Sequence, residues 1–159
     1  MHCIFLSSEL VFPSDSARVR CEHDVVGPET VYGRAKAEAE RIVQCHTGPW
    51  TVLRSSTLYG YTHARRSNFS EYVRRALQSS RTVDAYSDVF SAPLFLADLS
   101  TALVHIVCER MVGVLHATGN EYLSRAEIAN RIACVGGYDA ALIRAVPRSN
   151  DIAMPRAIR

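Results

Sequence analysis

Short apolar runs that alternate with longer amphipathic stretches form the main pattern of this 159-residue chain. A nearly continuous apolar run is typical of a parallel strand that is buried on both faces. Such runs predict strands at residues 3–6, 50–54, 82–83, 113–117 and 141–146. Small hydroxyl residues follow the first two runs, beginning at Ser7 and at Ser55.

Between the strands, apolar residues recur at the spacing of a helix. This spacing predicts helices that begin near Thr30, Asn68, Asp98 and Ser124. Ser124 and Glu127 form a capping-box pattern, and the helix that they open should end at the glycine pair 136–137.

The helix expected over residues 30–45 has one apolar and one charged face. The apolar stripe consists of Ala35, Ala39, Ile42 and Val43. The charged residues expected to face water are Glu38, Glu40 and Arg41.

Strands that alternate with helices predict an α/β fold with a mostly parallel sheet. A chain of this length is expected to form a single domain, residues 1–159, with a sizeable core. Residues 9–29 are rich in turn formers and predict an irregular loop over the site. Residues 147–159 predict an irregular tail.

The composition favours a soluble globular protein, with 48% hydrophobic and 21% charged residues. A net charge of +2 is too small to argue for a nucleic-acid or membrane partner. No apolar run approaches the roughly 18 residues of a membrane span, and the N-terminus lacks a signal-peptide pattern. We therefore expect a cytoplasmic protein.

The five cysteines are odd in number and widely spaced, which favours reduced, mostly buried side chains. They are Cys3, Cys21, Cys45, Cys108 and Cys134. The six histidines lack ligand spacing, so no metal site is expected. His116 lies inside a predicted strand and is interpreted as a hydrogen-bonded core residue.

The candidate chemistry centres on Tyr32 and Lys36. Residues four apart on a helix project from the same face. An ammonium about 4 Å from a phenol favours the phenolate by roughly 4 kcal/mol at an effective dielectric of about 20. We therefore expect Lys36, the only lysine in the chain, to lower the pKa of Tyr32 toward neutrality for general acid/base work. The alternative is an amphipathic helix with a solvated lysine.

Polar groups at the carboxyl ends of parallel strands gather at one edge of the sheet. Ser8 follows the first predicted strand and is placed where a catalytic group would lie. Two arginine pairs, residues 65–66 and 74–75, have the fork geometry to hold a diphosphate, although a solvated basic face is the favoured interpretation.

Several motifs occur in the order and spacing of the extended short-chain dehydrogenase/reductases, the NAD-dependent epimerase/dehydratase superfamily. Residues 5–12 resemble the family's fifth strand with its catalytic hydroxyl, residues 32–36 its Tyr-Gly-x-x-Lys helix, and residues 53–60 the strand beside the nicotinamide. Asn68 and residues 88–98 resemble parts of the substrate lobe. The dTDP-4-dehydrorhamnose reductase group is the most similar.

This resemblance implies the C-terminal part of a Rossmann-like doubly wound parallel sheet with a small substrate-binding lobe. It implies NAD(P)-dependent reduction of a nucleotide-linked keto-sugar. The implied catalytic residues are Ser8, Tyr32 and Lys36; the cofactor-binding residues are Ser7, Tyr32, Lys36, Ser55 and Ser56; the substrate-binding residues are Glu9, Thr57 and Asn68.

Two departures leave the substrate open. The reductase group typically has Asp after the catalytic hydroxyl residue and an aromatic residue at position 57, where this chain has Glu9 and Thr57. Its Asp-Gln-x-Gly-x-Pro-Thr segment is altered at residues 88–94. An epimerase or dehydratase of the superfamily is therefore an alternative.

The third departure is the lack of the Gly-x-x-Gly-x-x-Gly motif that holds the cofactor pyrophosphate in the family. The resemblance begins at the family's fifth strand, which implies that the N-terminal dinucleotide-binding βα units are absent. The first strand should then form an exposed sheet edge and favour association with a missing N-terminal half or a homodimer partner. We expect the chain alone to bind cofactor weakly or not at all; a non-catalytic binding module and an inactive fragment are alternatives.

Overall fold

The computed structural model describes residues 1–13, 19–61 and 68–148. The chain divides into two compact units. The first contains Met1–Thr57 and Leu96–Gly119, and the second contains Leu58–Phe95 and Asn120–Arg159.

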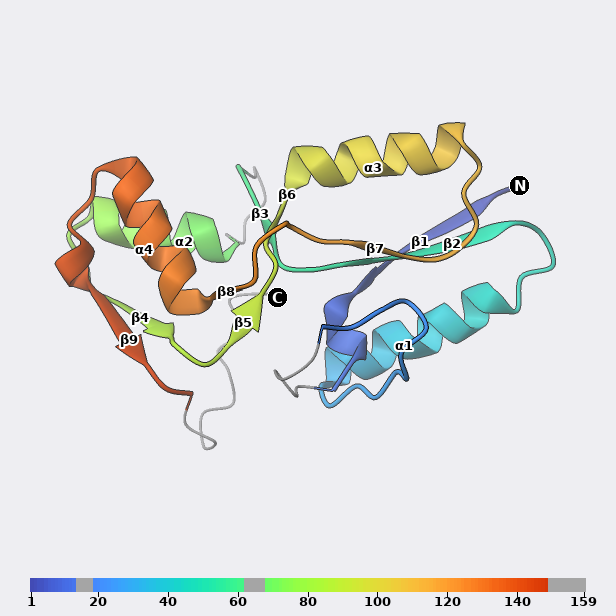
Figure 1. The fold of residues 1–159 in the computed structure, drawn as a ribbon, viewed down its shortest axis with the longest axis horizontal. Coiled ribbons are helices and arrows are strands. Elements are labelled where there is room, and N and C mark those ends of the chain that lie inside the picture. The colour runs from blue at the N-terminus through green and yellow to red at the C-terminus, as the bar shows by residue number, and fades with distance from the viewer. Residues whose placement is uncertain (14–18, 62–67, 149–159) are drawn as a thin grey trace. The chain divides into compact units, whose positions relative to one another are not determined.

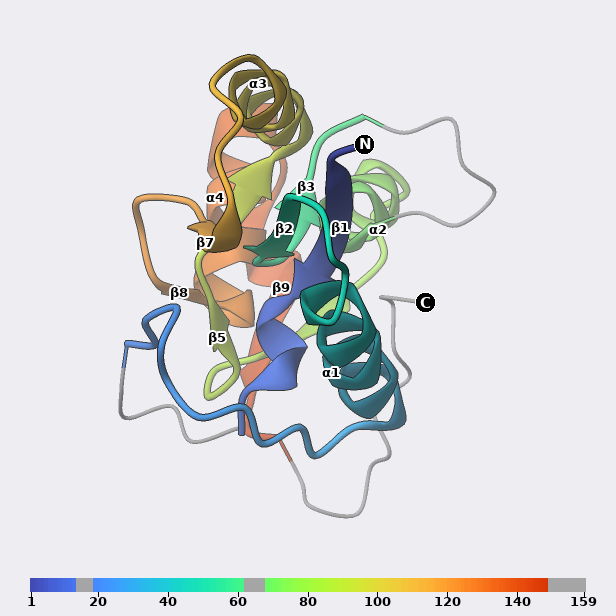
Figure 2. The ribbon, with the colours of Figure 1, turned by 90° about the vertical axis from the view of Figure 1, so that its right-hand side faces the viewer.

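The first unit is built on a three-stranded parallel sheet in the order β1-β2-β7. Its strands are β1 (Cys3–Ser8), β2 (Trp50–Ser55) and β7 (Gly113–Ala117). Figures 1 and 2 show the helices α1 (Val31–Gln44) and α3 (Leu96–Cys108) on opposite faces of this sheet. The central strand β2 is buried on both faces because both helices cover it, and Val52 and Leu53 are almost inaccessible to water.

Strand β1 lies at an edge of this sheet, as the sequence predicts. The backbone N–H of Cys3 donates to the carbonyl of Pro49 at 3.0 Å, so the odd-numbered residues of β1 face β2. Successive residues of a parallel strand turn their backbone groups to alternate sides. The backbone groups of Ile4, Leu6 and Ser8 therefore face the open edge, where the Leu6 side chain is 41% exposed.

The second unit packs two helices on a two-stranded parallel sheet. The helices are α2 (Phe69–Gln78) and α4 (Arg125–Gly136), and the strands are β4 (Val83–Tyr86) and β9 (Ile143–Val146), with the short helix η2 (Ala140–Leu142) before β9. Val73, Val83, Ala129 and Ala133 are fully buried between them. Two further strand pairs complete the unit: β3 (Leu58–Tyr59) with β6 (Leu94–Phe95), and β5 (Phe90–Ser91) with β8 (Leu123–Ser124).

The predicted α/β architecture with parallel sheets is confirmed. Helices α1, α2 and α4 begin after side-chain caps from Thr30, Asn68 and Ser124. The capping box of Ser124 with Glu127 is complete, and Gly137 takes the left-handed conformation (φ 65°) that ends α4.

Two predictions about the surface need correction. Cys21, Cys45, Cys108 and Cys134 are exposed, so the expectation of mostly buried cysteines is wrong. Ile42, placed in the apolar stripe of α1, is 68% exposed because it lies away from the sheet. No helix in the described part of the chain is long and apolar enough to cross a membrane.

Candidate functional site

The start of α1 packs directly against the turn that follows β1. The short helix η1 (Glu9–Val11) begins directly after Ser8, whose hydroxyl accepts from the N–H of Leu10 at 3.3 Å. Gly33 lies so near this turn that a Cβ there would be 2.1 Å from the Leu10 carbonyl oxygen. A glycine is therefore required at this close approach, and it brings the helix segment carrying Tyr32 next to the segment carrying Ser8.

Lys36 bridges α1 and β1. Its Nζ donates to the carbonyl of Leu6 at 2.7 Å and lies 4.7 Å from the centre of the Phe5 ring. The same Nζ is 5.7 Å from the centre of the Tyr32 ring. The ammonium thus lies between the Tyr32 ring and the strand that ends at Ser8, held by a backbone carbonyl at the open edge.

The expected lowering of the Tyr32 pKa is not found. Burial raises the pKa of Tyr32, because a partly desolvated phenol loses stability in its charged form. The Lys36 ammonium is directed to the carbonyl of Leu6 and to the Phe5 ring. In this conformation the Tyr32 phenol keeps its proton at neutral pH.

Hydroxyl groups that follow β2 surround the carboxylate of Glu9. Ser56 donates to its Oε2 at 2.5 Å, and Thr57 donates to its Oε1 at 3.3 Å. Ser55 donates to the carbonyl of Ser7 at 3.5 Å. The structure therefore brings the predicted residues Ser55, Ser56 and Thr57 together with the end of β1.

Beneath these strand ends lies a buried ion pair that the sequence analysis missed. Arg54 binds Glu40 through two nitrogens, at 3.0 Å and 2.7 Å, and both side chains are 4% exposed or less. Ser7 donates to the Glu40 carboxylate at 2.5 Å. The expectation that Glu40 faces water is therefore wrong, and the hydroxyl of Ser7, a predicted cofactor-binding residue, is hydrogen-bonded within the chain. One signal was available: an arginine inside an apolar strand requires a buried partner.

Arg54 and β7 also hold the loop that follows the undescribed residues 14–18. Arg54 donates to the carbonyl of Glu22 at 3.2 Å, and the Glu22 carboxylate accepts from the N–H of His116 at 3.1 Å. Backbone hydrogen bonding to the Glu22 carboxylate lowers its pKa. The His116 ring packs edge-on against Phe12, and burial lowers the pKa of His116.

In the second unit, Asn68 caps α2. Its side chain accepts from the N–H of Glu71 at 2.9 Å and donates to the carbonyl of Gly60 at 2.8 Å. Arg74 and Arg75 both bind the Glu71 carboxylate, so this pair is neither a free diphosphate clamp nor a purely solvated face. Arg65 and Arg66, the other candidate pair, lie outside the described residues.

The donor set of the first unit fits the nicotinamide end of a dinucleotide. The Lys36 ammonium lies beside β1, and the hydroxyls of Ser55, Ser56 and Thr57 lie where β2 ends. A pyrophosphate commonly binds at a helix N-terminus, and in the described residues those of α1, α2 and α4 each have a backbone N–H already bonded to a side-chain cap. Among the described residues no group of three or more His, Cys, Asp or Glu side chains is arranged to hold a metal ion.

These features define part of a Rossmann-like α/β fold, and comparison with known proteins agrees. The chain matches the family described as RmlD substrate binding domain over residues 1–157. The chain belongs to this family.

Three relatives illustrate the range of the family. The spore coat polysaccharide biosynthesis protein SpsK of Bacillus subtilis is 24% identical over 153 residues, which cover 96% of this chain and 53% of SpsK. The dTDP-4-dehydrorhamnose reductase of Sinorhizobium fredii is 30% identical over 144 residues, covering 86% of this chain and 47% of that protein. The methionine adenosyltransferase 2 subunit beta of Bos taurus is 26% identical over 161 residues, which cover 96% of this chain and 47% of that protein.

Solved structures share the fold. The dTDP-4-dehydrorhamnose reductase of Bacillus anthracis, determined in complex with NADP, superposes with a TM-score of 0.82 at 22% identity, covering 92% of this chain and 50% of that one. A dTDP-glucose 4,6-dehydratase of the same organism, in complex with NAD, gives a TM-score of 0.79 at 21% identity, covering 93% of this chain and 50% of that one. The chain thus spans about half the length of the relatives that it matches.

Proposed function

We propose that this chain supplies the proton-handling site of an NAD(P)-dependent reductase that acts on a nucleotide-linked keto-sugar. The relatives named as dTDP-4-dehydrorhamnose reductases support this substrate class. Ser8, Tyr32 and Lys36 are the proposed catalytic residues. The cytoplasm is the compartment that we propose for a reaction of this kind.

One observation carries the proposal: the close approach of Gly33 to the Leu10 carbonyl, with Lys36 bound to Leu6. These two contacts lie on either side of Ser8 along the chain. They join the helix carrying Tyr32 and Lys36 to the end of β1 at two points. A hydroxyl, a phenol and an ammonium are thereby supplied by two elements whose relative position is fixed.

The proposed roles follow from the protonation states. Burial raises the pKa of Tyr32, so its phenol carries a proton. Tyr32 donates this proton to the carbonyl oxygen of the sugar. The Ser8 hydroxyl donates a hydrogen bond to the same oxygen and orients it. The Lys36 ammonium stabilises the tyrosinate that is left. The bound nicotinamide cofactor supplies the hydride, which no side chain can carry.

The remaining cofactor contacts are proposed for the ends of the strands and for a partner. We assign Lys36 and Ser55 to the nicotinamide end, with Ser56 held nearby by Glu9. Glu9 and Thr57 are proposed to face the sugar, and Asn68 to order the start of the substrate-lobe helix. The pyrophosphate would then be held by a nucleotide-binding half that pairs with this chain.

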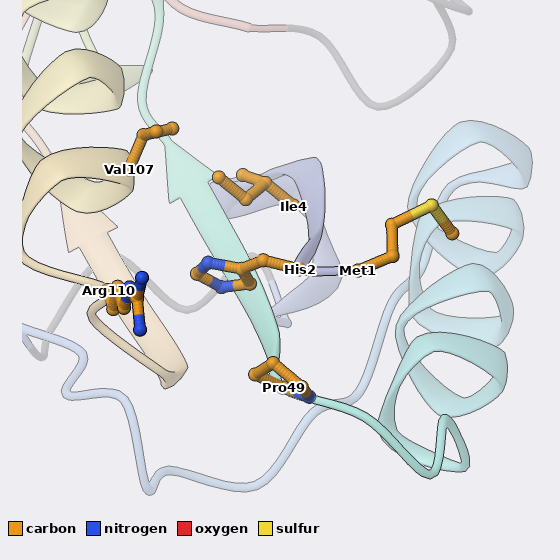
Figure 3. Close-up of a pocket in the computed structure, with 6 residues that line it drawn as sticks. All are labelled: Met1, His2, Ile4, Pro49, Val107 and Arg110. Carbon is orange, nitrogen blue, oxygen red and sulfur yellow. The ribbon is translucent and has the colours of Figure 1, made fainter.

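The open edge of β1 is the proposed docking place for that half. Beside the start of this strand lies a pocket of about 450 Å³. Figure 3 shows its lining: Met1, His2, Ile4, Pro49, Val107 and Arg110. A strand added along β1 would continue the parallel sheet, and its connection would cover this pocket. A second copy of the chain is the alternative occupant.

A non-catalytic module is the second candidate function. The similarity to a protein named as a subunit of methionine adenosyltransferase favours it, because that name describes a component of a different enzyme. In such a module the β1 edge would serve binding alone, and Tyr32 would be dispensable.

The experiment is reconstitution. This chain is co-expressed with the N-terminal half of the Sinorhizobium fredii reductase, cut where the two sequences begin to align, and NADPH oxidation is followed with dTDP-4-dehydrorhamnose. We expect turnover from the assembled complex and none from either part alone. A complex that binds NADPH but does not oxidise it with any nucleotide-linked keto-sugar would contradict the reductase proposal.

A further inference from the structure

The ion pair of Glu40 with Arg54 connects every element that carries a proposed catalytic residue in the first unit. Glu40 lies on α1 four residues after Lys36, so both side chains project from one helix face. Ser7 directly precedes Ser8 on β1, and Arg54 directly precedes Ser55 on β2. Ser7 and Arg54 are also register partners in the sheet.

The geometry of this group is tightly specified. The two oxygens of Glu40 accept three hydrogen bonds of 2.5 Å to 3.0 Å, from Ser7 and from two nitrogens of Arg54. The third nitrogen of Arg54 donates to the Glu22 carbonyl, and the guanidinium lies 5.0 Å from the centre of the Phe12 ring. A buried charge pair loses far more when its geometry is disturbed than an exposed pair does. Sliding of α1 along the sheet is therefore opposed at this point.

We propose that Glu40, held by Arg54 and Ser7, is a positioning residue: it fixes the face of α1 that carries Tyr32 and Lys36 against the strand end that carries Ser8. This inference rests on the proposed function for its meaning in catalysis. The structural part of the inference, that Glu40 fixes the position of the Lys36 ammonium, does not depend on the proposed function.

Lys36 offers a direct probe, because it is the only lysine in the chain. Lysine labelled with ¹⁵N gives a single side-chain ammonium signal, whose hydrogen exchange reports the bond from Lys36 to Leu6. A hydrogen bond to a charged group protects its proton by about tenfold or more. The readout needs no cofactor, substrate or partner.

The chain contains matched controls. Glu38→Gln removes an exposed carboxylate from the same helix, where Glu38 pairs with Arg41 at 3.4 Å. Ile106→Ala opens a cavity on α3, which packs on the opposite face of the sheet, and so lowers stability without touching the ion pair.

In the test, the Lys36 signal is compared between the wild type, Glu40→Gln, Ser7→Ala and the two controls, each well below its melting temperature. We expect Glu40→Gln to lose the roughly tenfold protection of the ammonium. Ser7→Ala keeps the ion pair and should fold even if Glu40→Gln does not; we expect a shifted signal and partial loss of protection. Both controls should give the wild-type signal.

The inference is overturned if the Lys36 signal in Ser7→Ala, and in any folded Glu40→Gln, is that of the wild type. It is equally overturned if Ile106→Ala changes that signal as much as they do, since the effect would then follow stability alone. In the reconstituted enzyme, Glu40→Gln should lower kcat by about 100-fold with little change in KM. Absence of wild-type turnover would count against the proposed function and leave the Lys36 comparison intact.

Discussion

Gly33 and the carbonyl oxygen of Leu10 approach each other so closely that no side chain fits between them. This contact fixes the first turn of α1 on the turn after Ser8. It explains why a glycine follows Tyr32 although glycine is a poor helix former. The spacing of Tyr32 and Lys36 is visible in the sequence, whereas this contact is visible only in the fold.

Substitution of Gly33 by alanine should therefore push α1 away from Leu10. A Cβ at this position would also lie 3.0 Å from the Cβ of Pro28, so the helix start is crowded by a second residue. We expect a loss of about 1 to 2 kcal/mol in the free energy of unfolding, measured by urea denaturation. Gly27→Ala is the matched control, since its Cβ would come no nearer than 3.5 Å to Pro13 and should change stability by less than about 0.5 kcal/mol. Equal losses would refute the close-approach argument.

Tyr32 should make stability depend on pH in the alkaline range. An unfolded tyrosine titrates near pH 10, and burial raises the pKa of folded Tyr32 above that value. The folded state then holds the proton more tightly than the unfolded state does. The contribution of Tyr32 to the free energy of unfolding is therefore present below about pH 10 and is lost as the pH rises through the folded pKa. Tyr32→Phe should show a smaller decrease in its urea midpoint between about pH 9 and pH 11. A larger decrease than in the wild type would mean that the sign is wrong.

Glu71 should have the opposite dependence, in the acid range. Hydrogen bonding from Arg74 and Arg75 lowers the pKa of Glu71 to about 2 from the ordinary 4.5. The stability that it contributes is present above pH 4.5 and is lost as the pH falls toward 2. We expect Glu71→Gln to cost about 1 to 2 kcal/mol at pH 7, a discounted value because both arginines are exposed, and to flatten the loss between those pH values. The measurement is the thermal unfolding midpoint as a function of pH across that range, with Glu38→Gln as control. Parallel pH dependences for Glu71→Gln and the wild type would contradict the assignment.

Docking of a strand on β1 should change the surroundings of Lys36. The Leu6 carbonyl faces the open edge and accepts from Lys36 at 2.7 Å, and a backbone N–H from an added strand would donate to the second lone pair of the same oxygen. We expect the single lysine ammonium signal to shift when the nucleotide-binding half of a relative binds. Complex formation without any change in that signal would place the partner elsewhere.

Much of the fold follows from local patterns. The strand at residues 113–117 and the capping box of Ser124 match the structure because each depends on a few neighbouring residues. Glu40 and Ile42 were placed on the wrong faces for a different reason. Helical periodicity alone does not fix which residues of the stripe reach the sheet, and it gives no information about a charged partner 14 residues away, such as Arg54.

In the candidate site too, the features that depend on neighbouring residues were predictable and those that depend on distant contacts were not. The sequence correctly predicts that Ser8 ends a strand and that Tyr32 and Lys36 lie on one helix, because apolar runs and helical spacing identify these elements. The direction of the Tyr32 pKa shift could not be predicted, since it depends on where the Lys36 ammonium points and on how much water reaches the phenol. The pairing of Glu71 with Arg74 and Arg75 likewise changes two candidate phosphate ligands into partners of a carboxylate.

The central claim is that Tyr32 exchanges the proton in a reductase reaction. The most direct measurement is NADPH oxidation by the reconstituted complex carrying Tyr32→Phe, with Tyr86→Phe on β4 as the matched control. We predict that Tyr32→Phe lowers kcat by about a thousandfold while NADPH binding is retained, and that Tyr86→Phe leaves the rate within about twofold of the wild type. Undiminished turnover in Tyr32→Phe would contradict the account.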